Sequence, residues 1–351
     1  MKKTNKILIS IVIAIILAVV LFFAIKHIRG NNISPVLNKI FSNQLYKKPY
    51  IPDGFKKVET DTASWAEKNG IIKGWNDGLV IEDNKGNQFV WVPCTIKQIE
   101  GVTQLSRSNY EPYKPKFIPI EGDRNICEDG NILYEDLDPS NIEIKKSVKK
   151  YCGFYIARFE TGIENGQLAE RNSNNEQVSN NESTKNLKWV NGSPVSKKGA
   201  CLYNYISTNE AEKISKTMYN TKVFHSALET SYCFDTVLKW IDAKAPKFSL
   251  NACDYGNYTI NNEDKQFCGT DDKCKIKNIY DFAGNAAELT KETGTRLSYN
   301  DTEDFYVVRD ERRSDTSRKE IACSAAPSFR TIIPQNSFHR NYGFRIVMYL
   351  I

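Results

Sequence analysis

The segment Asn278–Leu289, with the sequence NIYDFAGNAAEL, is the most informative stretch of this 351-residue chain. Four of its positions fall within eight residues: Asp281, Gly284, Asn285 and Glu288. Oxygen ligands at this spacing, with a glycine that lets carbonyl groups turn inward, can fold a short loop around a hard cation such as Ca²⁺. A second string, Asn341–Arg345 (NYGFR), places a glycine before an aromatic residue and an arginine in what we predict to be the final strand.

The first 29 residues differ from the rest of the chain. Ile7–Ile25 is an uncharged, proline-free run rich in Ile, Val and Leu, and about 20 such residues span a bilayer as a helix. The run lacks the small-residue cleavage pattern of a signal peptide. The sequence therefore predicts a cytoplasmic tail (1–6), a transmembrane signal anchor (7–25), a stalk (26–48) and an extracellular domain (49–351) of a single-pass cell-membrane protein.

Basic residues flank both ends of the predicted anchor, so charge orients it only weakly. The short N-terminal tail favours the N-terminus inside. The net charge is +6, and five of these charges belong to the anchor and its flanks, which leaves a net charge of +1 for the rest. A nucleic-acid binder would show a basic stripe, so nucleic acid is not an expected partner. The densest basic run, Lys145–Lys150, is predicted to be a solvated loop.

All nine cysteines lie outside the predicted anchor. Their odd number leaves at least one thiol in a monomer. Three of them, Cys94, Cys152 and Cys233, sit in apolar contexts typical of buried thiols. Cys268 and Cys274 bracket a polar loop and form the preferred disulfide prediction for an oxidising exterior. A zinc site is less favoured, because no histidine lies near these cysteines.

The order of predicted elements is strands, two helices, a long irregular region and further strands. Leu79–Asp83 and Gln88–Pro93 form a predicted hairpin, and the other predicted strands are Tyr151–Glu160, Phe305–Arg309 and Tyr342–Ile351. The predicted helices are Thr208–Tyr219, capped by Thr208 or Asn209, and Ser226–Ile241. The second carries an apolar stripe typical of a core helix: Tyr232, Phe234, Val237, Leu238 and Ile241. Glu164–Lys188 and Asn251–Asp281 are predicted to be irregular. This order indicates an α+β fold with one core.

Five segments, in this order, resemble the formylglycine-generating-enzyme (sulfatase-modifying-factor) family, a variant of the C-type-lectin-like fold: Gln88–Pro93, Gly153–Thr161, Glu229–Ile241, Ile279–Leu289 and Asn341–Arg345. The last two resemble the family strings Tyr-Asp-x-x-Gly-Asn-x-x-Glu-Trp and Asn-x-Gly-Phe-Arg. The resemblance runs from about Phe55 to the end and is greatest to the membrane-anchored or secreted bacterial branch. It implies a single domain of this family after the anchor.

The resemblance also implies a structural calcium site. Asp281 would supply a side-chain oxygen, Gly284 and Ala286 backbone carbonyls, and Glu288 a carboxylate. Asn285 would tie the loop to the backbone. The alternative is that Asp281 and Glu288 form only a helix cap and a surface charge.

The catalytic residues of the family are not matched. Its enzymes carry an Arg-Gly-Gly-Ser strand followed by two cysteines that bind copper, whereas Arg309 here is followed by Asp310 and Glu311. Only Cys323 lies between there and Arg330, and one thiolate cannot supply two-sulfur coordination of Cu(I). We therefore expect no copper and no catalytic residue. Arg330 and Arg345 are predicted to pin strands through hydrogen bonds.

These observations predict a membrane-anchored, surface-exposed and non-catalytic module that binds a protein or a glycan, or serves a surface assembly. The alternative is an enzyme on the same scaffold with altered chemistry, using Cys323 as its nucleophile. A buried structural thiol is the more ordinary role for Cys323, because no base stands beside it in the sequence. His225 could be at most one member of a metal-binding set, and His339 lies in a polar tail loop.

Overall fold

A computed structural model describes most of the predicted extracellular domain. The described residues are 47–111, 114–120, 124–128, 131–135, 141–164, 193–257, 267–296, 305–310, 326–335, 337 and 341–351. The chain divides into two compact units, Met1–Lys47 and Lys48–Ile351. The predicted anchor and most of the predicted loop Glu164–Lys188 lie outside the described residues. Within them, no helix combines the length and apolarity needed to cross a bilayer.

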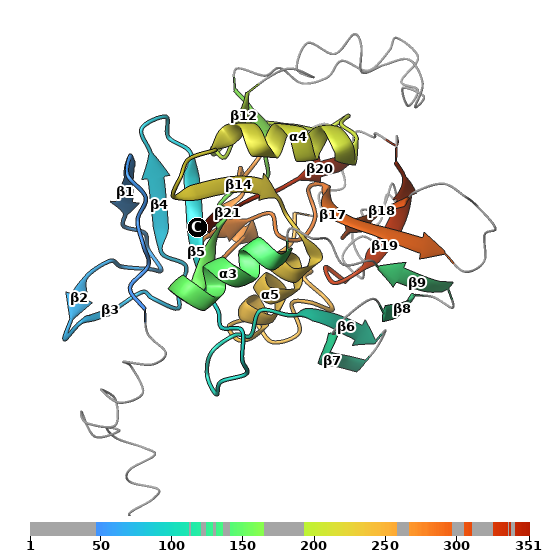
Figure 1. The fold of residues 1–351 in the computed structure, drawn as a ribbon, viewed down its shortest axis with the longest axis horizontal. Coiled ribbons are helices and arrows are strands. Elements are labelled where there is room, and N and C mark those ends of the chain that lie inside the picture. The colour runs from blue at the N-terminus through green and yellow to red at the C-terminus, as the bar shows by residue number, and fades with distance from the viewer. Residues whose placement is uncertain are drawn as a thin grey trace, which may run out of the picture. The chain divides into compact units, whose positions relative to one another are not determined.

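The main sheet joins the beginning of the domain to its end (Figure 1). Its order is β1 (Phe55–Val58), β4 (Val80–Asp83), β5 (Gln88–Pro93), β10 (Gly153–Ala157), β21 (Ile346–Leu350) and β14 (Phe224–Leu228). Every neighbouring pair is antiparallel. The predicted hairpin is therefore confirmed as β4–β5. All residues of β10 and β21 are buried, which explains why their sequences are continuously apolar.

A second sheet holds both of the motifs that opened the sequence analysis. Its order is β19 (Arg330–Pro334), β18 (Phe305–Arg309), β17 (Ala287–Arg296), β9 (Asn131–Glu135) and β8 (Arg124–Glu128), with β20 (Tyr342–Phe344) beside β17. β17 and β20 run parallel, with Ala287 opposite Tyr342 and Leu289 opposite Phe344. The predicted strand Phe305–Arg309 coincides with β18. The end of the first motif, Ala287–Leu289, thus lies beside Tyr342–Phe344 of the second, although the motifs are 52 or more residues apart in the sequence.

Four smaller sheets complete the strands within the described residues. They are β2 (Glu67–Lys68) with β3 (Ile71–Ile72), β6 (Arg107–Glu111) with β7 (Lys114–Ile120), β15 (Lys275–Ile276) with β16 (Ile279–Tyr280), and β11 (Gly162–Ile163) between β12 (Pro194–Val195) and β13 (Cys201–Leu202). The predicted irregular region Asn251–Asp281 therefore contains a short hairpin. The α+β prediction is confirmed.

Two of the three described helices were predicted, with boundary errors. α4 (Thr208–Met218) begins at the predicted residue, but the predicted cap at Thr208 or Asn209 is wrong, because Ser207 is the N-cap and forms a reciprocal capping box with Glu210. α5 (Ser231–Asp242) is capped by Thr230. The predicted start at Ser226 is wrong, since Ser226–Leu228 pair with β21 as part of β14.

The third helix, α3 (Asn141–Tyr151), was missed, and the loop predicted at Lys145–Lys150 is wrong. Ile144 and Val148 are buried one turn apart, so one side of α3 packs on the protein. This spacing of apolar residues is the helical period. The lysines lie between these buried positions, which hides the period in a strongly basic run.

The core forms around α5, whose predicted apolar stripe is confirmed. Tyr232, Phe234, Val237, Leu238 and Ile241 are all buried in one cluster with residues of β5, β10 and β21. Phe234 stacks on Phe282 with ring centroids 4.6 Å apart. Each such side chain contributes about 1.5–3 kcal/mol when it leaves water.

Asp235 on α5 binds two buried arginines from the second sheet. Arg309 Nη2 lies 2.7 Å from Asp235 Oδ1, and Arg330 Nη2 contacts Asp235 Oδ2. The side chains of all three residues are at most 1% exposed. Arg330 thus holds a strand through a hydrogen bond, as predicted, but its partner Asp235 lies on a helix, so it pins β19 to α5. Arg309 also lies over the Phe234 ring, at 4.3 Å.

The structure confirms the buried thiols predicted from the sequence but not the predicted disulfide. Cys94, Cys152 and Cys233 are buried thiols, as expected. The Cys268–Cys274 disulfide is wrong, because both residues are thiols. The backbone explains this result: Cys268 exchanges backbone hydrogen bonds with the turn at Gly199–Ala200, whereas the Cys274 carbonyl accepts the Asp281 N–H. Cys253 is disulfide-bonded.

We expect Asp235→Ala to destabilise the domain by about 3–5 kcal/mol, because it leaves two buried guanidinium groups without this carboxylate. Urea unfolding monitored by tryptophan fluorescence measures the change. Glu67→Ala is the matched control, since it removes an exposed carboxylate paired with Lys48 and should leave the midpoint essentially unchanged. Equal midpoints for the two variants would contradict the role of Asp235.

Candidate functional site

The inward side of Asn278–Leu289 is held by Arg345, which lies between β20 and β21. Its Nε donates to Glu288 Oε1 at 2.8 Å, and its Nη2 donates to the carbonyls of Tyr280 and Asp281 at 3.0 and 3.1 Å. Burial alone would lower the pKa of Arg345, but the carboxylates of Glu288 and Glu160 raise it above its ordinary value. The predicted pinning role of Arg345 is confirmed, and the side chain stays charged.

The four predicted calcium ligands lie along this same segment. Asp281 accepts hydrogen bonds from Gly269 N at 2.6 Å and Asn257 Nδ2 at 3.2 Å, and burial raises its pKa to about 6. Glu288 holds Arg345. Both carboxylates are thus bound by protein donors.

The backbone of the predicted calcium loop also faces carboxylates. Gly284 N donates to Asp310 Oδ2 at 2.6 Å, and Ala286 N donates to Glu160 Oε1 at 3.1 Å. Among the residues that the structure describes, no three His, Cys, Asp or Glu side chains are placed to hold a metal ion together. Arg345 pairs with Glu288 Oε1, whereas Glu288 Oε2 is buried without a hydrogen-bond partner among the described residues, so a calcium ion would share this carboxylate with a guanidinium. Calcium here stays a prediction that these contacts do not favour.

Asn285 does not have the predicted backbone role. Its Nδ2 donates to the Glu160 carboxylate, so its side chain joins the loop to the segment that follows β10. Asp281, Gly284 and Asn285 all have positive φ, at 51°, 79° and 57°. A Cβ at Gly284 would lie 2.5 Å from the Asn257 carbonyl oxygen, so only glycine suits this position.

Sequence reasoning missed the buried acids that complete this inward side. Glu160 and Glu229 are fully buried. Burial raises the pKa of Glu160 well above its usual range, with Asp281 adding to the effect, and burial together with Glu288 does the same for Glu229. The signal in the sequence was an acid shortly after each of two strands: Glu160 lies three residues past β10, and Glu229 directly follows β14.

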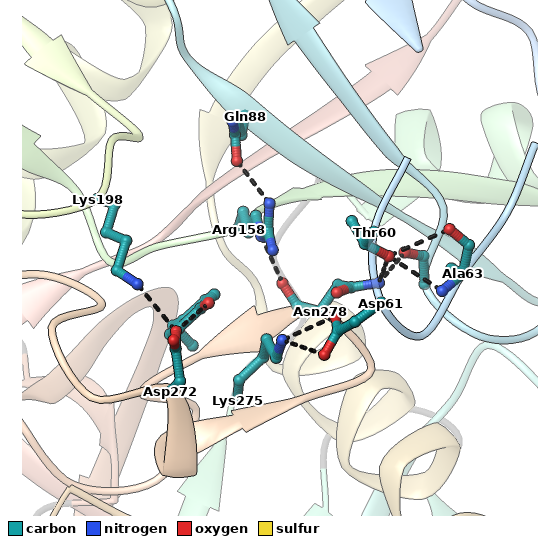
Figure 2. Close-up of polar contacts among 11 residues, drawn as sticks. Thr60, Asp61, Ala63, Gln88, Arg158, Lys198, Asp272, Lys275 and Asn278 are labelled. Atoms are coloured by element: carbon teal, nitrogen blue, oxygen red, sulfur yellow. Dashed lines mark hydrogen bonds and ion pairs between the residues drawn. The ribbon is translucent and has the colours of Figure 1, made fainter. Parts of the chain in front are cut away.

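The outward side of the same segment carries a cluster that the sequence analysis did not predict (Figure 2). Three cationic groups lie over the Tyr280 ring: Arg158 at 5.3 Å, Lys198 at 5.4 Å and Lys275 at 6.0 Å from its centroid. The Phe159 ring lies 5.0 Å from the Tyr280 ring. We call Tyr280, Arg158, Lys198 and Lys275 the Tyr280 cluster. Cations are attracted to an aromatic face by its quadrupole.

Two exposed carboxylates border the Tyr280 cluster. Asp272 Oδ1 accepts hydrogen bonds from Tyr280 Oη at 2.6 Å and Lys198 Nζ at 2.9 Å. Asp61 accepts from Lys275 Nζ with both oxygens, each at 2.9 Å. The side chains of Asp61 and Asp272 are 65% and 68% exposed. The cluster therefore has three cations and two solvated counter-ions.

Short-range structure explains how these groups meet. Lys275 and Tyr280 are directly opposite in the β15–β16 hairpin. Its turn uses Lys277 and Asn278 at positive φ, and the Asn278 carbonyl accepts a hydrogen bond from Arg158 Nε at 3.1 Å. Arg158 Nη1 also donates to Gln88 Oε1 at 2.7 Å, so Arg158 is fixed from two sides (Figure 2).

The ionisation of Asp272 and Tyr280 does not suit acid–base catalysis. Hydrogen bonds from Lys198 and Tyr280 lower the pKa of Asp272 to about 2. Burial and the bond to Asp272 raise the pKa of Tyr280 to about 12. A general acid or base works best with a pKa near the working pH. Neither group meets that condition.

The remaining candidates from the sequence do not form a site among the described residues. His225 lies in β14 against Tyr349, with ring centroids 6.0 Å apart. Cys323 and His339 lie outside the described residues. The chain matches no family model, no curated protein and no solved structure. The family resemblance therefore stays a prediction.

Lys277, next to this turn, provides a test of the local electrostatics. Its Nζ donates to the Asn76 carbonyl at 2.7 Å and lies 4.6 Å from the Trp240 ring centroid. Burial lowers the pKa of Lys277 from 10.5 to about 8. Because the unfolded chain binds the proton more tightly, stability rises with pH between about 8 and 10.5 and the penalty is fully present below pH 8.

We expect the free energy of unfolding of Lys277→Met to exceed that of the natural chain below pH 8, by at most about 3 kcal/mol. This difference should shrink as the pH rises towards 10.5. Urea unfolding at several pH values under reducing conditions measures the difference. For Lys216→Met, which removes an exposed lysine of α4, the difference should not vary with pH. A pH-independent difference for Lys277→Met would contradict the burial of its charge.

Proposed function

We propose that this chain is a membrane-anchored, surface-exposed and non-catalytic binding module of the sulfatase-modifying-factor type. Its ligand is an anionic protein segment or glycan that carries carboxylate or sulfate groups and binds at the Tyr280 cluster. The observation that carries this proposal is the placement of Arg158, Lys198 and Lys275 over one tyrosine ring. The anchor 7–25 would hold the module at the membrane.

Ligand exchange at the cluster requires little energy. The Lys198–Asp272 pair is exposed on both sides, at 50% and 68%. Exposed ion pairs contribute little to stability, with measured values of about 0–1 kcal/mol. A carboxylate or sulfate group of a ligand can therefore replace the Asp272 carboxylate on Lys198. Arg158 stays in place, because its bonds go to Gln88 and Asn278.

The site chemistry supports binding over the alternative of an enzyme with altered chemistry. Asp272 and Tyr280 do not change protonation near neutral pH. Arg309, which the resemblance aligns with the catalytic strand of the family, is engaged by Asp235. The sequence lacks the cysteine pair that would bind copper.

Retention on immobilised anionic polymers tests the proposal. The full chain in detergent is passed over dextran sulfate and over polyglutamate, and the stronger interaction identifies a glycan-like or a peptide-like ligand. We expect Lys198→Glu to weaken the preferred interaction about tenfold, which corresponds to about 1.4 kcal/mol. Raised salt should weaken it as well, since exposed charges are screened.

Lys48→Glu is the matched control. Lys48 is 54% exposed and pairs with Glu67 at 2.6 Å, so this variant makes the same change of charge at an equally exposed pair outside the Tyr280 cluster. Its affinity should stay within about twofold of the natural chain. Equal losses in the two variants, or no retention on either polymer, would reject the Tyr280 cluster as the binding site.

A further inference from the structure

Two cysteines face each other where β5 and β10 meet α3. The β5–β10 register pairs Val92 with Phe154 and Pro93 with Gly153. One step further along the same ladder, Cys94 is opposite Cys152, and Cys94 N donates to the Cys152 carbonyl at 3.1 Å. Residues opposite each other in an antiparallel pair have Cα atoms about 4.5–5.5 Å apart. Disulfides span Cα distances of roughly 4.4–6.8 Å, so the backbone already suits a bond between these two residues.

The backbone at Cys152 is fixed by the end of α3. Cys152 has a φ of 59°, and its N–H donates to the Val148 carbonyl at 2.8 Å. The left-handed conformation ends the helix and turns the chain directly into β10. Cys152 therefore keeps its place opposite Cys94 without help from the side chain.

A third thiol, Cys233 of α5, lies in the same buried core cluster as Cys94. Burial raises the pKa of Cys94 well above its ordinary value, and Cys233 and Cys152 add to this effect. The hydroxyl of Thr230 donates to Cys233 Sγ at 3.5 Å. Cys94 and Cys233 are fully buried, whereas Cys152 is 8% exposed. Cys152 is thus the thiol of the three that a reagent in solution reaches first.

We propose that Cys94 and Cys152 form a cross-strand disulfide when the protein meets a small-molecule disulfide oxidant such as oxidised glutathione. The Cys152 thiolate attacks one sulfur of the oxidant and releases one thiol, which leaves a mixed disulfide on Cys152. Cys94 then loses its proton and attacks the Cys152 sulfur, which releases the second thiol. Two protein thiols are oxidised by two electrons, and the oxidant is reduced to two thiols.

The bond would join the C-terminal end of α3 to the end of β5 and close the chain between residues 94 and 152 into a loop. A disulfide that closes a long loop stabilises the folded state by restricting the unfolded chain. The Tyr280 cluster shares no residue with this pair, so the inference is separate from the proposed binding function.

Peptide mapping of the full chain tests the disulfide. The protein in detergent is equilibrated in oxidised and reduced glutathione at several ratios, quenched with acid, alkylated in denaturant and digested with trypsin without reductant. Cys94 and Cys152 fall in separate tryptic peptides, 86–97 and 151–158, each with a single cysteine. At oxidising ratios we expect the two peptides to be joined, with a mass two hydrogen atoms below their sum, and at reducing ratios we expect them to be separate. The oxidised protein should melt at a temperature several degrees higher than the reduced protein.

Three variants sharpen the result. Cys152→Ser should abolish both the joined peptide and the oxidant-dependent rise in melting temperature. Cys233→Ala and Cys274→Ser, which change buried thiols outside the pair, should leave both unchanged. The proposal is overturned if peptides 86–97 and 151–158 are alkylated singly at every ratio, or if Cys94 is joined to the Cys233 peptide. The natural chain alone decides this, even if a variant fails to fold.

Discussion

The buried charge of Arg345 is the contact on which the rest of this structure depends. It reaches Glu288 in β17, the carbonyls of Tyr280 and Asp281, and, through Nη1, the Ala157 carbonyl at 3.2 Å. These groups belong to the main sheet, the second sheet and the loop between them. A guanidinium has five donors and no acceptor, so it can satisfy several buried oxygens at once. Removing one member of such a buried pair leaves an uncompensated charge, which is strongly destabilising.

The contacts of Arg345 on the inward side of Asn278–Leu289 fix the position of the Tyr280 cluster on its other side. The Tyr280 carbonyl faces Arg345, while its ring, in a residue that is only 4% exposed, lies beneath the three cations. Gly269 supports both sides, because its N–H binds Asp281 and its Cα lies against Phe159, where an added Cβ would come within 2.3 Å of the ring. One tightly constrained segment thus connects a buried acidic network to an exposed cationic one. A ligand at the Tyr280 cluster would meet Arg158, which is fixed by Gln88 and Asn278, and the half-exposed side chain of Lys198.

The parts of the fold that could be predicted are those with a local period or a local turn. Leu79–Asp83 and Gln88–Pro93 are runs of strand-forming residues separated by a turn, so their hairpin could be predicted. The stripe from Tyr232 to Ile241 has helical spacing, so its burial was readable as well. α3 was missed because Ile144 and Val148 are embedded in lysines, and the start of α5 was misplaced because β14 is defined by its distant partner β21.

The candidate site was less predictable than the fold for the same reason. Lys198, Lys275 and Arg158 come from three separate parts of the chain, and nothing in the spacing of these residues indicates that they meet. The cysteines show the two cases side by side. Burial of Cys94 followed from its apolar neighbours, whereas the error at Cys268 and Cys274 came from taking closeness in sequence for closeness in space.

The segment after β18 shows how this chain uses the positions that the resemblance assigns to chemistry. Asp310, where the family string has a glycine, has a φ of 57°, a conformation that ordinarily favours glycine and that Asp tolerates better than most residues. Its carboxylate receives the Gly284 N–H, so the aspartate keeps the glycine-like backbone and adds a contact to the opening motif. Arg309 beside it is held by Asp235. Both side chains are therefore engaged inside the protein.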